Sequence, residues 1–194
     1  MNRAEVQTTG IAGLGAIVQP RMIWLSIGFA VAMVAATAIR VWLPFSPVPV
    51  TLQTFVVLLA GLSLGATWGG FSQVQYVILG ALGLPAFAGG LAALFGPSGG
   101  YIIGFVVAAV IVGAIYSAWR TTPGAIVACL AGTAAIYVFG CIWLLALSIG
   151  SVAEVAAIGV LPFLPGDVLK LAAAVALVRA PLTGSAIRRL CGHH

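Results

Sequence analysis

The sequence predicts an all-α integral membrane protein with six transmembrane helices, and composition is the first observation behind that prediction. Of its 194 residues, 62% are hydrophobic and 6% are charged, whereas soluble domains carry about 25% charged residues. The second observation is a series of uncharged apolar runs, several of them close to the length that spans a bilayer as a helix. These runs do not alternate in polarity, which argues against a membrane barrel.

Charge and cysteine content exclude other classes. The net charge of +5 comes from scattered basic residues, which form no stripe for nucleic acid. Cys129, Cys141 and Cys191 lack metal-ligand spacing, and the first two lie in an apolar run where small packing residues are expected. His193 and His194 end the chain, where a tag remnant and a functional role are equally open. We therefore expect no metal site.

The apolar runs divide the chain into one membrane domain, 1–194, with a tail at 1–21, a six-helix bundle at 22–180 and a second tail at 181–194. The expected helices are 22–39, 51–65, 71–82, 101–118, 125–149 and 167–178. We expect a tight turn at 65–70 and a short irregular or partly helical link at 148–159. Polar residues of the third helix, among them Tyr76, need partners inside the bundle.

Three segments contain unusual backbone residues. Three prolines in six positions make 43–53 a stiff extended loop. The glycine-rich stretch 83–101 is too apolar for a solvated linker, so we expect it to fold onto the bundle, where its backbone can approach a ligand. The third segment, 161–170, reads LPFLPGDVLK and contains Asp167 and Lys170.

Asp167 and Lys170 are three residues apart, which places them on one face of a helix beginning at or near Asp167. One interpretation is structural: Asp167 caps the helix and Lys170 reaches the membrane interface. The other is that an acid and a base in an apolar region mark a polar ligand site. The two interpretations are compatible.

Six spans place both termini on one side of the membrane, and the basic residues indicate that this side is the cytoplasm. The residues expected inside are Arg3, Arg21, Arg120, Arg179, Arg188 and Arg189. Only Arg40 and Lys170 fall outside. The three unusual segments then share the outer face, where we expect them to form an outward-facing pocket.

Four motifs resemble the signature segments of BioY, the biotin-binding S component of energy-coupling-factor (ECF) transporters. They are PFSPVPVTLQ at 44–53, GLPAFAGG at 83–90, GPSGGY at 96–101 and LPGDVLK at 164–170. The resemblance implies a six-helix fold in the cell (inner) membrane of a prokaryote, with biotin bound at the extracellular end. It also implies partnership with a transmembrane T component and two cytoplasmic ATPases. The glycine-rich 96–100 lacks the Lys-Ser/Thr of a P-loop.

The resemblance also assigns residues. It makes Asp167 and Lys170 ligand contacts, and it makes Gly83 and Gly89 part of the binding-site wall. Some family members have Asn where this chain has Gly89, which can offer only backbone groups. Small residues four apart in the first helix let another helix approach, and in S components such pairs are associated with T-component docking. Ala32 and Ala36 fit that pattern, although packing within the bundle is an equal alternative.

The chemistry of biotin agrees with these residues. Ionised Asp167 can accept a hydrogen bond from a ureido N–H, and Lys170 can pair with the ureido carbonyl or with the tail carboxylate. Further candidate contacts near the same end are Gln53, Phe87, Trp42, Tyr76 and Tyr101. Biotin is then the transported ligand, and we expect no cofactor.

The alternatives are an S component for another vitamin and a membrane-embedded enzyme that uses Asp167 and Lys170 as acid and base. Against an enzyme, the sequence shows neither a nucleophile beside a base nor a metal-ligand cluster. A purely structural subunit would not concentrate unusual loops on one face. A self-sufficient secondary transporter would need charged relays across the bilayer, which the sequence lacks.

Overall fold

We describe the protein from a computed structural model, which covers residues 19–84, 86–87 and 90–180. Some predictions therefore concern residues outside the described part of the chain: those for Gly89, Cys191, His193 and His194, for the tail 181–194, and for all but the last three residues of the tail 1–21. All other candidate site residues lie within it.

The described chain is helical apart from one short hairpin, as the composition predicts. Its elements are α2 (Pro20–Ala38), β1 (Arg40–Val41), β2 (Val50–Thr51), α3 (Gln53–Ala81), the 3₁₀ turn η1 (Leu91–Leu94), α4 (Gly99–Ala118), α5 (Thr122–Ala146), α6 (Val152–Gly159) and α7 (Leu164–Arg179). Helices α2, α3, α4 and α5 are each long and apolar enough to cross a membrane. Helices α6 and α7, bent by 53° at their junction, together qualify as a fifth candidate.

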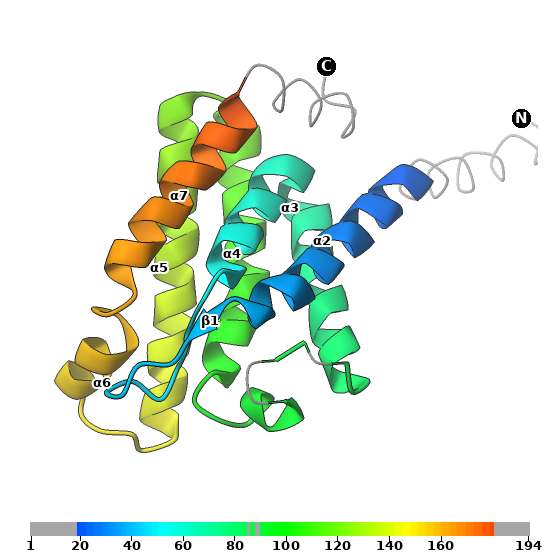
Figure 1. The fold of residues 1–194 in the computed structure, drawn as a ribbon. Helices are drawn as coiled ribbons and strands as arrows, with labels where there is room; N and C mark the ends of the chain where they lie inside the picture. The colour runs from blue at the N-terminus through cyan, green and yellow to red at the C-terminus, as the bar shows by residue number, and fades with distance from the viewer. Residues whose placement is uncertain (1–18, 85, 88–89, 181–194) are drawn as a thin grey trace, which may run out of the picture.

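Helix α3 is broken at a single residue. Gly65 has φ 76° and ψ −175°, a conformation that is open almost only to glycine. The chain folds back there, because a Cβ added to Gly69 would lie 3.1 Å from the Cα of Gly61, eight residues earlier. Figure 1 shows the two arms, residues 53–64 and 66–81, as a helical hairpin.

The expected turn at 65–70 is therefore wrong beyond its first residue. Gly69 and Gly70 are helical and buried, and they serve close packing rather than chain reversal. A Cβ on Gly70 would lie 2.6 Å from Cγ2 of Val110 in α4. Small residues at such crossings let helix backbones approach each other, which is how helices pack without water to drive them together.

The core lies where α3, α4 and α5 cross. Gly61 and Gly132 both face Val112 of α4, so that three helices meet at one side chain. Cys129 is fully buried beside this contact layer, which agrees with its expected packing role, and Cys141 is half-buried. These contacts bring the three helices close together at the centre of the bundle.

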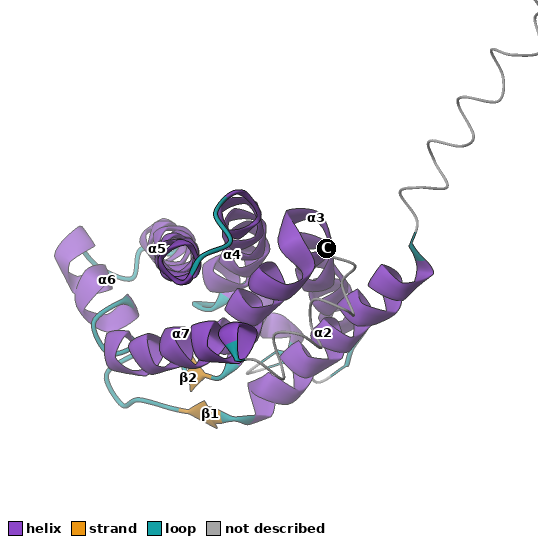
Figure 2. Cartoon of the chain, turned by 90° about the horizontal axis from the view of Figure 1, so that it is seen from above, coloured by secondary structure: helices purple, strands orange, loops and turns teal. Residues whose placement is uncertain are grey.

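The three unusual segments all lie at one end of the bundle. Figure 1 shows the beginning of α2 and the end of α7 at the upper side, and α6, the β1–β2 hairpin and the loop before α4 at the opposite side. At the upper end, Nη1 of Arg179 lies 3.5 Å from the carbonyl oxygen of Arg120, which joins α7 to the α4–α5 turn. Seen from above, α4 and α5 are viewed nearly end-on, whereas α2 and α7 lie across the view (Figure 2).

The proline-rich loop is held as a hairpin. Strands β1 and β2 are antiparallel, with Arg40 opposite Thr51 and Val41 opposite Val50. The buried Ser46 hydroxyl donates a 2.8 Å hydrogen bond to the carbonyl of Ile158, which ties the loop to α6.

The link at 148–159 is partly helical, which is one of the two expected forms. It contains α6, whose N-terminus has a capping box between Ser151 and Glu154. One boundary near the C-terminal end differs from expectation. Helix α7 begins at Leu164 rather than near Asp167, because Pro165 fits the first turn of a helix, where its missing N–H costs nothing. Asp167 therefore lies in the first turn but is not the cap, which is Phe163.

Candidate ligand-binding site

The loop end of the bundle contains a cavity to which all three unusual segments contribute. Val48, Pro49 and Thr51 come from the proline-rich hairpin, Ala93 and Ser98 from the glycine-rich stretch, and Phe163 from the turn before α7. Helices α3, α4, α5 and α7 complete the wall. The cavity is open to solvent, and the non-atom space that it spans, part of it open solvent, is about 560 Å³. The predicted convergence of the three segments on one pocket is thus what the fold produces.

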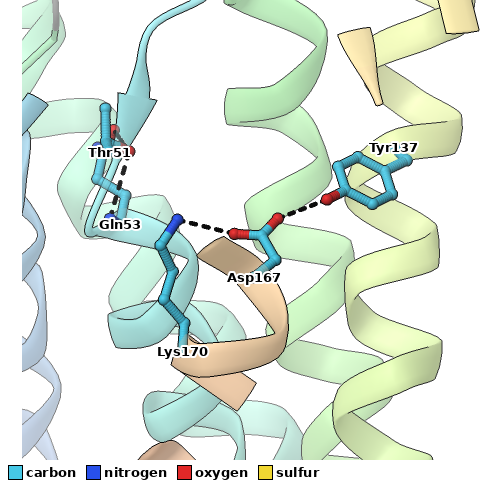
Figure 3. A network of polar contacts seen from close by, with 5 residues as sticks. All are labelled: Thr51, Gln53, Tyr137, Asp167 and Lys170. Carbon is cyan, nitrogen blue, oxygen red and sulfur yellow. Dashed lines mark hydrogen bonds and ion pairs between the residues drawn. The ribbon is translucent and has the colours of Figure 1, made fainter. Parts of the chain in front are cut away.

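Asp167 is the polar centre of the cavity. Its side chain lies in the first turn of α7, where the positive end of the helix dipole favours a carboxylate. Oδ1 lies 2.7 Å from Nζ of Lys170, one turn further along, and Oδ2 accepts a 2.6 Å hydrogen bond from the hydroxyl of Tyr137 in α5 (Figure 3). The Lys170 and Asp167 side chains are 12% and 6% exposed. Both oxygens of this buried carboxylate therefore have partners.

A second polar group borders the cavity at the start of α3. The Gln53 side chain accepts a 3.1 Å hydrogen bond from the Thr51 hydroxyl through Oε1, and its Nε2 donates to the Tyr76 hydroxyl at 2.6 Å. Tyr76 in turn donates to the carbonyl of Ala86 at 2.8 Å. In Figure 3, Thr51 and Gln53 lie on the Lys170 side of Asp167, and Tyr137 lies on its other side. This chain of bonds fixes the amide and links the hairpin to the glycine-rich stretch.

Tyr101 supplies part of the aromatic wall. Its hydroxyl donates a 2.9 Å hydrogen bond to the carbonyl of Gly159, at the end of α6. Its ring lies against Gly140 of α5, where any side chain would collide with it. The Phe163 ring lies next to it, with centroids 6.3 Å apart. A flat apolar group entering the cavity would meet these two rings.

Four of the residues predicted from the sequence thus line the cavity: Asp167, Lys170, Gln53 and Tyr101. Gly83 is not among the residues that line it; it is exposed two residues past the end of α3, with φ 92°. Phe87 is 3% exposed and packs edge-on against Tyr76, with ring centroids 5.4 Å apart. The ligand contacts assigned to these residues stay predictions.

The remaining candidates lie elsewhere. Trp42 is 56% exposed on the proline-rich hairpin. Tyr76 does not line the cavity, but its hydroxyl accepts a hydrogen bond from the side chain of Gln53, which does. Ala36 is 4% exposed and belongs to the main core, and Ala32 is partly buried beside it. Ala32 and Ala36 therefore pack largely within the bundle of this chain. Their expected role in docking the T component also stays a prediction.

Sequence reasoning missed Tyr137. It lies in the middle of the long apolar run that forms α5, and the only signal was that its hydroxyl is one of the few polar groups of this run, together with Thr133 and the Trp143 indole. Its importance depends on α5 packing beside α7, which no local pattern encodes. Among the described residues, no group of three or more His, Cys, Asp or Glu side chains could hold a metal ion.

Fold and site together define a class of protein. Long apolar helices enclose a small, largely apolar cavity with a few convergent hydrogen-bonding groups at one end of the bundle, as in a membrane protein that binds a small polar molecule. The sequence then identifies the family: residues 7–186 match the BioY family, and the chain belongs to it.

Curated relatives and a solved structure agree with this family assignment. A probable biotin transporter BioY of Pyrococcus horikoshii is 40% identical over 154 residues, 77% of this chain and 91% of that protein. The biotin transporter BioY of Thermotoga maritima is 35% identical over 150 residues, 72% of this chain and 85% of that protein. A crystal structure of the S-component for biotin from an ECF-type ABC transporter superposes with a TM-score of 0.74 at 26% identity, covering 89% of this chain and 92% of that chain.

Proposed function

We propose that this chain is the biotin-capture subunit of an ECF-type transporter and that biotin binds in the cavity at the loop end of the bundle. The observation that carries the proposal is the buried Asp167–Lys170 pair, held by Tyr137 inside a cavity to which all three unusual segments contribute. Membership of the BioY family and the likeness to the biotin S-component support it.

The cavity suits the parts of biotin. The carboxylate of Asp167 accepts from a ureido N–H, and the ammonium of Lys170 donates to the ureido carbonyl. Hydrogen bonds to charged groups are roughly twice as strong as neutral ones. The apolar ring lies against the aromatic wall of Tyr101 and Phe163. In the free protein Asp167 and Lys170 satisfy each other, so the ligand exchanges one set of partners for another and no buried charge is left alone.

In this proposal the chain crosses the membrane six times, with both termini in the cytoplasm. The six passes are α2, the two arms of α3, α4, α5 and the bent pair α6–α7. The break at Gly65 supports counting α3 as two passes. The cavity then opens to the outside of a prokaryotic inner membrane, which is where an uptake subunit must capture its substrate.

Uptake requires energy from partner subunits: a transmembrane T component and two cytoplasmic ABC-type ATPases. The S-component whose crystal structure resembles this chain comes from an ECF-type ABC transporter, and that likeness supports partners of the same kind here. Membership of the BioY family supports the view that the chain is a binding subunit and not an enzyme.

Direct binding tests the proposal. Detergent-purified protein is titrated with biotin, thiamine and riboflavin by calorimetry. The proposal predicts saturable binding of biotin alone. Binding of another vitamin in its place would favour a different S component, and heat from none of the three would refute capture of these vitamins by the isolated chain.

A further inference from the structure

The ionisable pair in the cavity leaves one end of the proposed ligand unaccounted for. Asp167 and Lys170, the acidic and basic residues that line the cavity, sum to zero charge, and the Lys170 ammonium already faces the Asp167 carboxylate at 2.7 Å. Biotin has a carboxylate at the end of its flexible chain and is an anion at neutral pH. An anion in a largely apolar cavity needs a cation of its own.

Arg40 lies beside the cavity wall. It is opposite Thr51 in the two-stranded hairpin, and Thr51 lines the cavity. Residues directly opposite each other on antiparallel strands project to the same face, with Cβ atoms about 5 Å apart. The Arg40 side chain therefore starts on the face of the hairpin that borders the cavity. Arg40 is exposed and is not among the residues that line the cavity, so a ligand in the cavity could meet its long side chain only at the mouth.

The Arg40 guanidinium has no partner within the residues that the structure describes. The other described cations all have one: Lys170 pairs with Asp167, Arg179 contacts the carbonyl of Arg120, and Arg21 and Arg120 each make interactions of their own. A free guanidinium offers a planar fork of N–H donors that fits a carboxylate bidentately.

We propose that Arg40 binds the carboxylate tail of the ligand at the mouth of the cavity and makes the site selective for the anionic vitamin over its neutral derivatives. The inference rests on the proposed function. It also fixes a direction for the ligand: the ureido end lies at buried Asp167 and the tail points to exposed Arg40. The Asp167–Lys170 pair, whose net charge is zero, then meets the uncharged ureido group, and the cation Arg40 meets the charged tail.

The test compares two ligands on one substitution. Arg40→Gln removes the charge and keeps a polar side chain, and biotinamide removes the charge of the ligand while keeping its rings. We expect Arg40→Gln to weaken biotin binding about fivefold and to leave biotinamide binding unchanged. Arg40→Lys should recover part of the loss. The effect on biotin should shrink at high salt, because Arg40 is exposed.

Arg21→Gln is the matched control, since it removes the same charge from the opposite end of α2, and it should leave both ligands unaffected. The inference is overturned if Arg40→Gln weakens biotin and biotinamide equally, or weakens neither, while wild-type protein binds biotin. If wild-type protein fails to bind biotin at all, the proposed function itself fails, and the two outcomes are therefore distinct.

Discussion

The hydroxyl of Tyr137 donates a 2.6 Å hydrogen bond to Oδ2 of Asp167, across the contact between α5 and α7. Since Lys170 takes Oδ1, the carboxylate is held from two helices and cannot rotate freely. A ligand that bonds Asp167 therefore meets a group already oriented, which reduces the entropy lost on binding. Tyr137 is a positioning residue in this account.

Tyr137→Phe tests that role. The substitution keeps the ring and removes the hydroxyl, so that Asp167 loses one of its two partners. We expect biotin affinity to fall about fivefold, the value of one hydrogen bond to a charged group after partial compensation, with the melting temperature little changed. Titration calorimetry and thermal unfolding in detergent measure the two effects.

Tyr116→Phe in α4 is its matched control, because Tyr116 packs beside the core outside the cavity. It should bind biotin as wild type does. Equal losses in the two variants, or none in Tyr137→Phe, would remove Tyr137 from the site.

A glycine in α5 sets the position of the aromatic wall. Gly140→Ala places a methyl group against the ring of Tyr101, which has no room to accept it. Overpacking of this kind typically costs about 1–3 kcal/mol, so we expect a lower melting temperature together with weaker biotin binding. Gly28→Ala in α2 is the control, since nothing lies within 4 Å of the added carbon. If Gly140→Ala has the melting temperature and the biotin affinity of wild type, the Tyr101 ring can move to accept the methyl group, and Gly140 does not set its position.

The topology predicts opposite labelling of two exposed positions. In a chain whose own cysteines are replaced, a cysteine at Leu84, near the start of the glycine-rich stretch, should react with an impermeant maleimide added outside intact cells. A cysteine at Trp119, in the α4–α5 turn, should react only after the cells are opened. Both native side chains are about half exposed, at 48% and 47%. The reverse pattern would invert the orientation.

The sequence was sufficient to predict the helical membrane class, the three special segments and the spacing of the Asp167–Lys170 pair. Each of these features depends on residues that are close together in the sequence: the length of an apolar run, the density of proline and glycine, or a separation of three residues on a helix. Gln53 was predictable for a similar reason, because it is the last residue of the proline-rich segment.

Other features depend on packing between distant elements. Tyr137 matters only because α5 lies beside α7. The glycines at 69 and 70 have the composition of a turn but serve close helix contact, and sequence alone does not distinguish the two uses. The partly helical link expected at 148–159 is confirmed by α6, but its start at Val152 was not predicted, although Ser151 and Glu154 have the spacing of a capping box.

The central claim is that biotin completes the buried pair of Asp167 and Lys170, and Asp167→Asn tests it most directly. The amide keeps the shape of the carboxylate but removes its charge and leaves Lys170 without its counter-ion. Glu154→Gln is the matched control, because it makes the same change in the capping box of α6, where Gln also fits. In parallel calorimetric titrations of folded protein, we expect Asp167→Asn to weaken biotin binding by more than about tenfold and Glu154→Gln to match wild type. Unchanged affinity in Asp167→Asn would contradict the account.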